Sequence, residues 1–184
     1  MASARALASL PRRIAAVIYE SMLVGALVLA LGFAMLPLYE PAAPGEHSLV
    51  ILPPFMREVS FGVVFAVCGA YCAWLWTGGR RTLPMKTWRI ALESASGSVV
   101  TAGPALVRYL ACWIAPACSI LAYLILRPYG QGRWALALLA INHAWALIDP
   151  DRQFLHDRIA GTRLVAELPS RKRSANAATV SDAD

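Results

Sequence analysis

Residues 12–23 read RRIAAVIYESML, a stretch that joins two arginines to a long apolar run with one carboxylate inside it. Glu20 follows Arg13 by seven residues, which on an α-helix is about 10 Å along the axis with a drift of only ~20° around it. One stripe of the helix would therefore carry a cation at its entrance and a carboxylate further along. If the run crosses a membrane, such a charge costs roughly 2.5–3.5 kcal/mol on insertion scales, so we expect Glu20 to face protein and to have a partner.

The composition supports a membrane location. Of the 184 residues, 58% are hydrophobic and 15% are charged, whereas soluble domains carry about 25% charged residues. A net charge of +6 would suggest a nucleic-acid partner in a soluble protein. Here the positions of the basic residues are more informative than their sum, and we expect no nucleic-acid partner.

The fold class predicted from the apolar stretches is an all-α membrane protein with four transmembrane helices. The four spans cover residues of about 14–38, 59–77, 104–126 and 134–148. The first three reach the ~20 residues needed to cross a ~30 Å hydrocarbon core, whereas the fourth is shorter and contains Asn142 and His143. The spans form one membrane domain, residues 12–165, between a cytoplasmic tail at 1–11 and a disordered cytoplasmic tail at 166–184.

Basic residues support the count of four, because cytoplasmic loops carry an excess of lysine and arginine. With four spans, 14 of the 17 basic residues fall on one side, and only Arg57, Arg127 and Arg133 fall on the other. The sequence therefore predicts a multi-pass protein of a bacterial inner membrane with both termini in the cytoplasm. The first run is longer than the 7–15 residues of a signal-peptide core, so we expect it to remain as an anchor.

Two features lie inside the spans. Pro116 is expected to kink the third span. The row of Gly62, Ala66 and Ala70 in the second span is expected to allow close approach of a neighbouring helix.

Two short elements are expected outside the spans. Residues 88–92 and 99–101 are apolar and flank a Ser/Gly turn, which predicts a small cytoplasmic hairpin, with an irregular loop as the alternative. Asp149 and Pro150 have the form of an N-cap and first helical residue, and Gly161 the form of a helix end. The sequence thus predicts a short interfacial helix after the fourth span.

Three segments carry a likeness to a known family. They are the stripe at 13–20, TLPMKTWR at 82–89 and RQFLHDRIAGTR at 152–163. Together they resemble the RDD family of bacterial integral membrane proteins, which is named for one arginine and two aspartates. The resemblance implies that Arg13 is the arginine and Asp157 the closing aspartate, while Glu20 replaces the first aspartate with a side chain one methylene longer. It also implies an undefined biochemical role, for which transport of unidentified ligands, including cation/proton exchange, has been proposed.

A polar cluster is expected where these segments meet, formed by Arg13, Glu20, Arg108, Asp157 and Arg158. In a transport site, Glu20 would exchange a proton or a cation beside the arginines. In a structural site, Arg13 or Arg108 would pair with Glu20, and Arg158 would lie near Asp157, which would fix the helix register. Both readings stay open.

Secondary candidates are Asn142, His143 and His156. Hydrogen bonds between helices are the plainer role for the first two, and a proton relay with Glu20 is the alternative. For His156 we expect helix capping or pairing with Asp157. The four cysteines lack the paired spacing of a metal site, and no nucleotide-binding or catalytic motif is recognisable. We therefore expect no metal, no cofactor and no enzymatic activity.

Two functions fit these observations. The first is a transport-related membrane protein, in which a substrate path would need a homo-oligomer or other membrane proteins. The second is a structural or assembly partner in a membrane complex, which would use the buried polar cluster and the basic cytoplasmic face. That face is also expected to attract anionic lipid headgroups of the bilayer.

Overall fold

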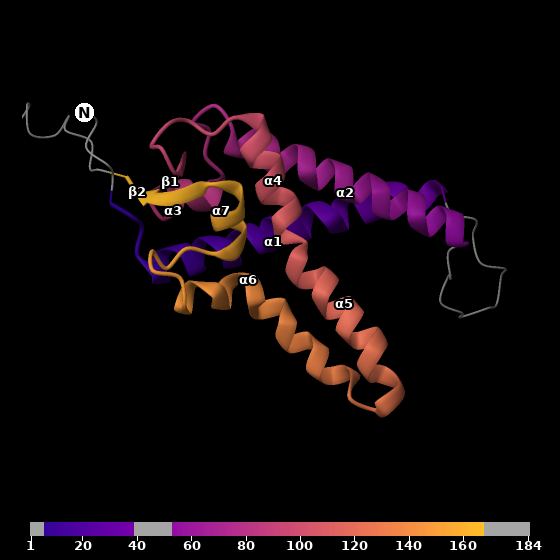
Figure 1. The fold of residues 1–184 in the computed structure, drawn as a ribbon. Helices are drawn as coiled ribbons and strands as arrows, with labels where there is room; N and C mark the ends of the chain where they lie inside the picture. The colour runs from indigo at the N-terminus through magenta and orange to yellow at the C-terminus, as the bar shows by residue number, and fades with distance from the viewer. Residues whose placement is uncertain (1–5, 39–52, 168–184) are drawn as a thin grey trace, which may run out of the picture.

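The computed structural model describes residues 6–38 and 53–167, and it is mostly helical (Figure 1). Three helical stretches among these residues are long and apolar enough to cross a membrane. They are Leu10–Leu38, Pro54–Trp76 and Ala102–Tyr129. The first three predicted spans are thus confirmed as candidates, whereas the fourth is not among them. Predictions for residues 1–5, 39–52 and 168–184 lie outside the described residues.

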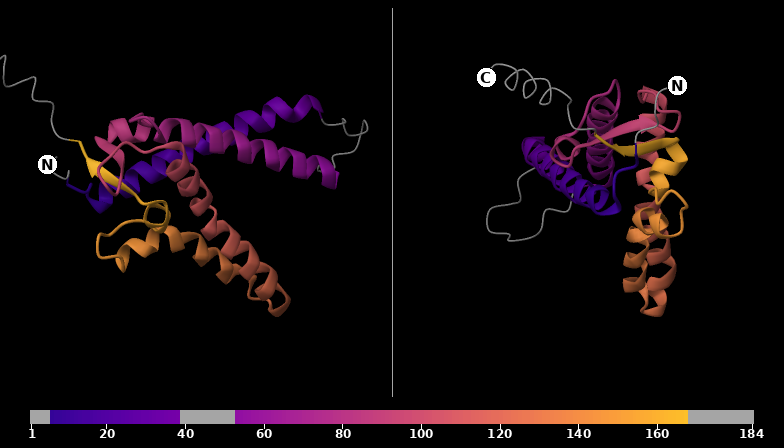
Figure 2. Two further views of the ribbon diagram at one scale, coloured as in Figure 1. Left: turned by 45° about the horizontal axis from the view of Figure 1, so that its top comes forward. Right: turned by 90° about the vertical axis from the view of Figure 1, so that its left-hand side faces the viewer.

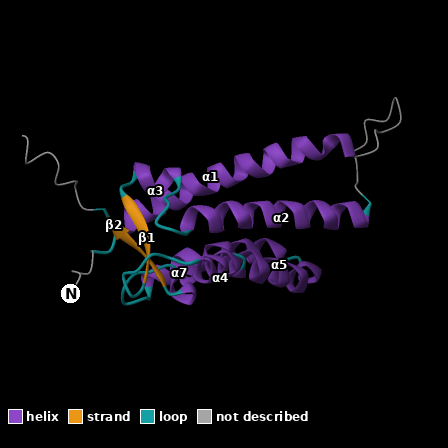
Figure 3. Ribbon diagram, turned by 90° about the horizontal axis from the view of Figure 1, so that it is seen from above, coloured by secondary structure: helices purple, strands orange, loops and turns teal. Residues whose placement is uncertain are grey.

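The first two long helices form an antiparallel pair (Figure 3). Helix α1 (Leu10–Met35) continues into the short 3-10 turn η1 (Leu36–Leu38), and α2 (Pro54–Trp76) returns beside it. Both begin earlier than predicted, and both have a proline in their first positions. Proline fits there because the first backbone N–H groups of a helix have no intrahelical partner.

The third candidate span consists of two helices, α4 (Ala102–Cys112) and α5 (Ile114–Leu126), separated at Trp113. The predicted kink is thereby confirmed, three residues before the proline itself. Pro116 has no N–H to donate to the carbonyl of Cys112, four residues earlier, and its ring crowds that carbonyl. The Cys112 carbonyl instead accepts a hydrogen bond of 3.0 Å from Asn142 Nδ2.

The chain then folds back along α5. After η2 (Arg127–Tyr129) and a turn at Gly130, the segments η3 (Gly132–Ala140), α6 (Ile141–Ala144) and η4 (Trp145–Leu147) follow one another. Ser119 Oγ of α5 donates to the Ala135 carbonyl at 2.8 Å. The hairpin of α5 and η3 diverges from the hairpin of α1 and α2 (Figure 2).

A two-stranded antiparallel sheet closes one end of the molecule (Figure 1). Strand β1 (Ile90–Ser94) pairs with β2 (Thr162–Ala166), with Leu92 opposite Leu164. The N-terminal segment joins them, because the Ala8 N–H donates to the Leu164 carbonyl at 3.0 Å.

The predicted hairpin is wrong in its second strand, because residues 99–101 form no strand and β2 is the partner of β1. Ile90 and Leu92 of β1 are both buried. They belong to the buried core together with Leu164 of β2, which lies directly opposite Leu92. A partner 70 residues away in the chain leaves no local signal in the turn sequence.

Two short helices flank the sheet. Helix α3 (Leu83–Thr87) begins after Thr82, whose hydroxyl accepts from the Met85 N–H. Helix α7 (Leu155–Ala160) ends, as predicted, at Gly161 in a left-handed conformation.

The predicted start of this second helix at Asp149 is wrong. Asp149 Oδ2 accepts from the backbone N–H groups of Asp151 and Gln153, each at 3.0 Å, and so caps a turn that precedes the helix. Helix α7 is also largely enclosed by protein, because His156, Asp157 and Ala160 are buried.

The small-residue row of α2 has no helix against it, since Gly62, Ala66 and Ala70 are all exposed. The close approach occurs at Gly69 instead, where an added Cβ would lie 2.9 Å from the ring of Tyr109 on α4.

Candidate polar site beside the sheet

The centre of the site is a buried ion pair between α4 and α7. Arg108 Nε donates to Asp157 Oδ1 at 2.7 Å, and the two residues are 3% and 1% exposed. The Thr162 hydroxyl, at the start of β2, donates to the same carboxylate oxygen at 3.0 Å. Of the predicted cluster, the structure brings together Arg108 and Asp157, which lie 49 residues apart in the chain.

The charge states follow from burial and from these partners. Burial alone would favour a neutral Asp157, but the adjacent Arg108 and the hydrogen bonds hold the pKa of that carboxyl below its usual value. His156 Nε2 lies 3.7 Å from Asp157 Oδ2. Burial lowers the pKa of His156 to about 4, so His156 is neutral near pH 7. The pair of Arg108 and Asp157 thus carries balanced charges.

Glu20 is linked to this pair by Trp76, which contacts both Glu20 and Arg108. The indole N–H of Trp76 donates to Glu20 Oε1 at 3.4 Å, and the guanidinium of Arg108 lies over the Trp76 ring, 4.2 Å from its centroid. The buried Thr82 hydroxyl is a second donor toward Glu20. Within residues 6–38 and 53–167, no lysine or arginine nitrogen lies at ion-pair distance from Glu20.

Arg13 occupies the same side of the molecule without pairing to either carboxylate. It is 3% exposed, and its guanidinium lies over the ring of Phe154, 5.6 Å from the centroid. Arg13 Nε has no hydrogen-bond partner among the described residues. Of the two arginines expected to pair with Glu20 in a structural site, neither Arg13 nor Arg108 does so among the described residues.

Arg158 faces away from the buried pair. Its side chain is half exposed and lies 3.2 Å from Asp151 and 3.7 Å from Asp149. It belongs to the surface turn before α7, although it is the next residue in sequence after Asp157. The structure therefore does not bring Arg158 to the pair of Arg108 and Asp157, where it was expected.

The secondary candidates Asn142 and His143 contact residues other than Glu20. Asn142 bonds the carbonyl freed by the helix break, as expected for a residue that links helices. The ring of His143 lies 5.1 Å from the ring of Phe154 and 6.0 Å from that of His156. Neither Asn142 nor His143 has a hydrogen bond to Glu20 in the described part of the chain.

Sequence reasoning missed the residues that complete the site. Trp76 and Thr162 are hydrogen-bond donors to the two carboxylates, and Phe154 supports Arg13. Trp76 is the last residue of α2, a place where membrane helices often carry tryptophan. Phe154 and Thr162 stand two or more residues from Asp157 in the closing motif, and nothing in their own residue types indicates a role.

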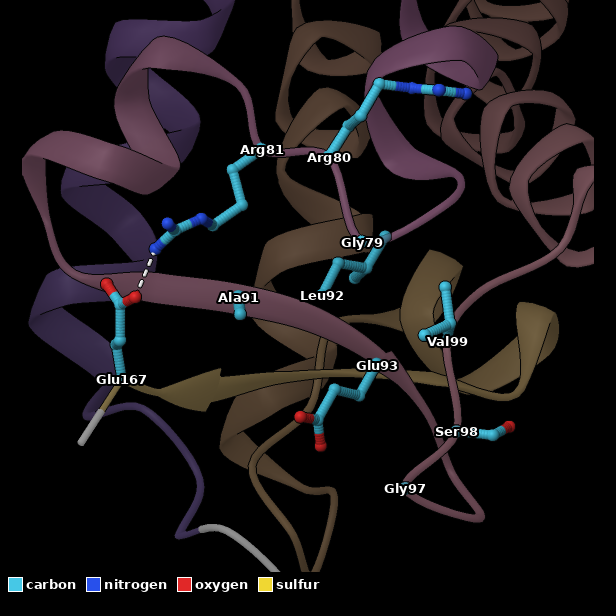
Figure 4. A pocket seen from close by; sticks show the side chains of 10 residues that line it. All are labelled: Gly79, Arg80, Arg81, Ala91, Leu92, Glu93, Gly97, Ser98, Val99 and Glu167. Carbon is cyan, nitrogen blue, oxygen red and sulfur yellow. Dashed lines mark ion pairs between the residues drawn. The ribbon is translucent and has the colours of Figure 1, made fainter. Parts of the chain in front are cut away.

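A separate cavity of about 350 Å³ lies beside β1, outside this cluster (Figure 4). Arg81 and Glu167 form an ion pair of 2.5 Å at its edge, and Arg80 stacks on Trp74. The predicted site residues do not line it. The described residues contain no group of three histidine, cysteine or acidic side chains placed to hold a metal ion.

A helical chain with three apolar helices of membrane-spanning length and a buried ion pair beside their ends is a membrane-type protein. The chain belongs to the RDD family, whose model matches residues 7–161. Neither the comparison with curated proteins nor that with solved structures gives a match.

Proposed function

We propose that this protein crosses a bacterial inner membrane four times, with both termini in the cytoplasm, and exchanges protons for a cation at Glu20. Its membrane domain is residues 12–165. We propose no catalytic role and no cofactor. The lipid bilayer, a second copy of the chain or other membrane proteins are the partners that this function needs.

The shared sheet supports an even number of crossings. Strand β1 follows α2, strand β2 follows the last helical segment, and residues 6–8 precede α1, yet all three lie together. The chain therefore returns to one side after α1 and α2 and again after α5 and η3. Most basic residues among the described segments flank that side, the exceptions being Arg57, Arg127 and Arg133, and the positive-inside rule assigns such a side to the cytoplasm.

The length of the returning segment also supports a fourth crossing. Residues 132–147 are fewer than an α-helical span needs, but most of them form 3-10 turns. Because a 3-10 helix rises ~2.0 Å per residue rather than 1.5 Å, the segment spans about 30 Å, the thickness of a hydrocarbon core.

The observation that carries the exchange proposal is the contrast between the two carboxylates. Asp157 accepts hydrogen bonds from Arg108 and Thr162 and is committed to its ion pair. The hydrogen-bond donors of Glu20 among the described residues are neutral, and the Arg108 guanidinium lies over the face of the indole whose N–H reaches Glu20. A partly buried carboxylate with no direct counter-ion among its described neighbours is the group best able to take up a proton or a cation.

The test measures proton-coupled cation flux in vesicles that contain the purified protein. Glu20→Gln should abolish the flux, because glutamine cannot ionise, and Glu20→Asp should retain part of it. Glu58→Gln is the matched control, since Glu58 is exposed at the start of α2 and far from the cluster in sequence. Flux that is absent from the parent protein, or unchanged in Glu20→Gln, contradicts the proposal.

The second candidate function is a structural or assembly partner in a membrane complex. Its support is the buried pair of Arg108 and Asp157, which joins helix α4 to the closing segment. Exposed basic residues near the sheet, including Arg89 and Arg152, are available to a partner or to anionic headgroups. A folded parent protein without flux favours this candidate.

A further inference from the structure

The hydrogen bonds at the two ends of the sheet fix the direction of the backbone groups of strand β1. The Glu167 N–H donates to the Arg89 carbonyl at 2.9 Å, and the Ala95 N–H donates to the Gly161 carbonyl at 2.8 Å. In an antiparallel pair, residues that bond the partner strand alternate with residues whose backbone groups point away from it. The positions of β1 that bond β2 are therefore odd-numbered, and the backbone groups of its even-numbered residues point to the outer edge.

Leu92 is the central residue of this outer edge. Its neighbour on the same edge, Ser94, donates its N–H to the Ser98 carbonyl at 2.9 Å, in the turn that follows β1. The Leu92 N–H and carbonyl have no hydrogen-bond partner among the described residues, although Leu92 is only 6% exposed. Because roughly 90% or more of buried backbone groups in proteins are paired, the outer edge of β1 lacks a partner at Leu92.

The cavity of about 350 Å³ adjoins this edge (Figure 4). Ala91 and Leu92 line it on the side of β1, and residues 79–81 line the opposite side. The other edge of the sheet is occupied, because residues 6–8 bond β2 there. An extended chain that entered the cavity would offer a carbonyl and an N–H to Leu92, which is how peptides add a strand to a sheet edge.

The charges around the cavity favour an acidic segment. Both acidic residues of its lining are near an arginine, Glu167 in an ion pair with Arg81, and Glu93 at 3.9 Å from Arg163. Arg80 also lines the cavity, and it has no carboxylate at ion-pair distance in the described part of the chain. An acidic segment would complement this unmatched positive charge.

We propose that the cavity binds an extended acidic peptide segment of another protein, which adds a strand to β1 through hydrogen bonds with Leu92. A second copy of this chain cannot supply its own β1, because residues 79–81 border the outer edge of that strand in the same way. The inference goes beyond cation exchange and requires no particular orientation in the membrane.

A selection of random heptapeptides displayed on phage tests this site, with the purified full-length protein in detergent as the target. We expect the enriched peptides to be acidic. A fluorescent synthetic peptide of the most enriched sequence then serves as the probe, and anisotropy measures its binding. Ala91→Trp, which fills the cavity from β1, should weaken that binding at least tenfold.

Ala95→Trp is the matched control, because Ala95 is exposed, follows β1 and lies outside the cavity lining. It should bind the peptide as the parent protein does, and circular dichroism checks that both variants are folded. Peptides that bind a folded Ala91→Trp variant as tightly as the parent overturn the proposal. A selection that enriches no peptide on the parent also overturns it.

A second measurement leaves the protein unchanged and tests the strand itself. Methylation of the backbone N–H groups of the peptide, one at a time, should weaken binding at every second residue, because alternate N–H groups of a strand point to the same neighbour. A loss without this period of two overturns strand addition. Binding that appears only after removal of residues 168–184 would show that the chain fills its own cavity, and it overturns the proposal of a separate partner. None of these measurements needs an ion gradient, so a failure of the Glu20 flux test leaves them unaffected.

Discussion

The two carboxylates of this protein show how neighbours decide what a charged residue does. Asp157 lies in the first turn of α7, receives Arg108 and Thr162 as donors, and contacts a neutral histidine. A buried charge with this many partners is fixed in place. Glu20, with an indole as its principal donor, is not bound so strongly. A structural role for Asp157 and an exchange role for Glu20 are therefore compatible within one cluster.

At Asp157 we predict a large loss of stability. Asp157→Asn leaves the Arg108 guanidinium buried without a counter-charge, which costs about 3–5 kcal/mol. Arg158→Gln is the control, because the exposed Arg158 side chain contributes less than about 0.5 kcal/mol. Unfolding of the purified variants in detergent, followed by circular dichroism, gives both values. Similar losses for the two variants would contradict the assignment of the buried pair.

At this scale the sequence predicts part of the site. Arg108 and Asp157 were recognisable because a charge next to or within an apolar run needs a partner. Arg158 was grouped with Asp157 because it is the next residue in sequence, although adjacent residues of a helix point in directions about 100° apart. Glu20 and Arg108 both contact the Trp76 side chain, one at its N–H and the other over its ring, and no spacing along the chain encodes that arrangement.

Among the elements, the broken third span links a proline to an asparagine on another helix. Pro116 frees the Cys112 carbonyl, and Asn142 Nδ2 donates to it. A polar residue in the returning segment therefore has a structural use that does not involve ion passage. The sequence predicted the kink from the proline. It did not predict that Asn142 would donate to the freed Cys112 carbonyl, because Asn142 lies 30 residues after Cys112 in the chain.

The contact of α2 with α4 gives an element-scale prediction. An added Cβ at Gly69 would lie 2.9 Å from the Tyr109 ring. That ring is held by a hydrogen bond of 2.8 Å to the Phe65 carbonyl and cannot easily move. Gly69→Ala should therefore destabilise the protein by about 1–3 kcal/mol, as overpacking does.

Gly62→Ala provides the comparison on the same helix. An added Cβ there meets nothing within 4 Å, so the change should be neutral or slightly stabilising. Thermal unfolding in detergent compares the two. Equal midpoints would mean that α2 and α4 are not packed tightly at Gly69.

In the whole molecule, the hairpin of α1 and α2 and the hairpin of α5 and η3 diverge (Figure 2). They meet at a junction formed by the sheet of β1 and β2 and the buried pair of Arg108 and Asp157. The chain passes this junction before α1, after α2 and after the returning segment. The junction therefore combines residues from both ends of the chain, and the buried ion pair joins the second hairpin to the sheet.

This arrangement predicts the sidedness of two exposed loops. Ser96→Cys and Gln131→Cys, each in a background with the native cysteines replaced by alanine, should react with an impermeant maleimide from opposite sides. Ser96 follows β1 and should react from the cytoplasm, whereas Gln131 joins α5 to η3 and should react from outside. Reaction of both from the same side would exclude a crossing by α5 and η3.

The sequence by itself determined the helical membrane character, three of the spans, the helix break near Pro116 and membership of the RDD family. These depend on local composition, on runs of apolar residues and on short motifs. Only the tertiary structure decided that β1 pairs with β2, that Arg108 rather than Arg158 binds Asp157, and that Glu20 meets an indole. Those contacts join residues 49 to 70 or so positions apart, and their geometry is set by how the helices pack, which no periodicity along the chain specifies.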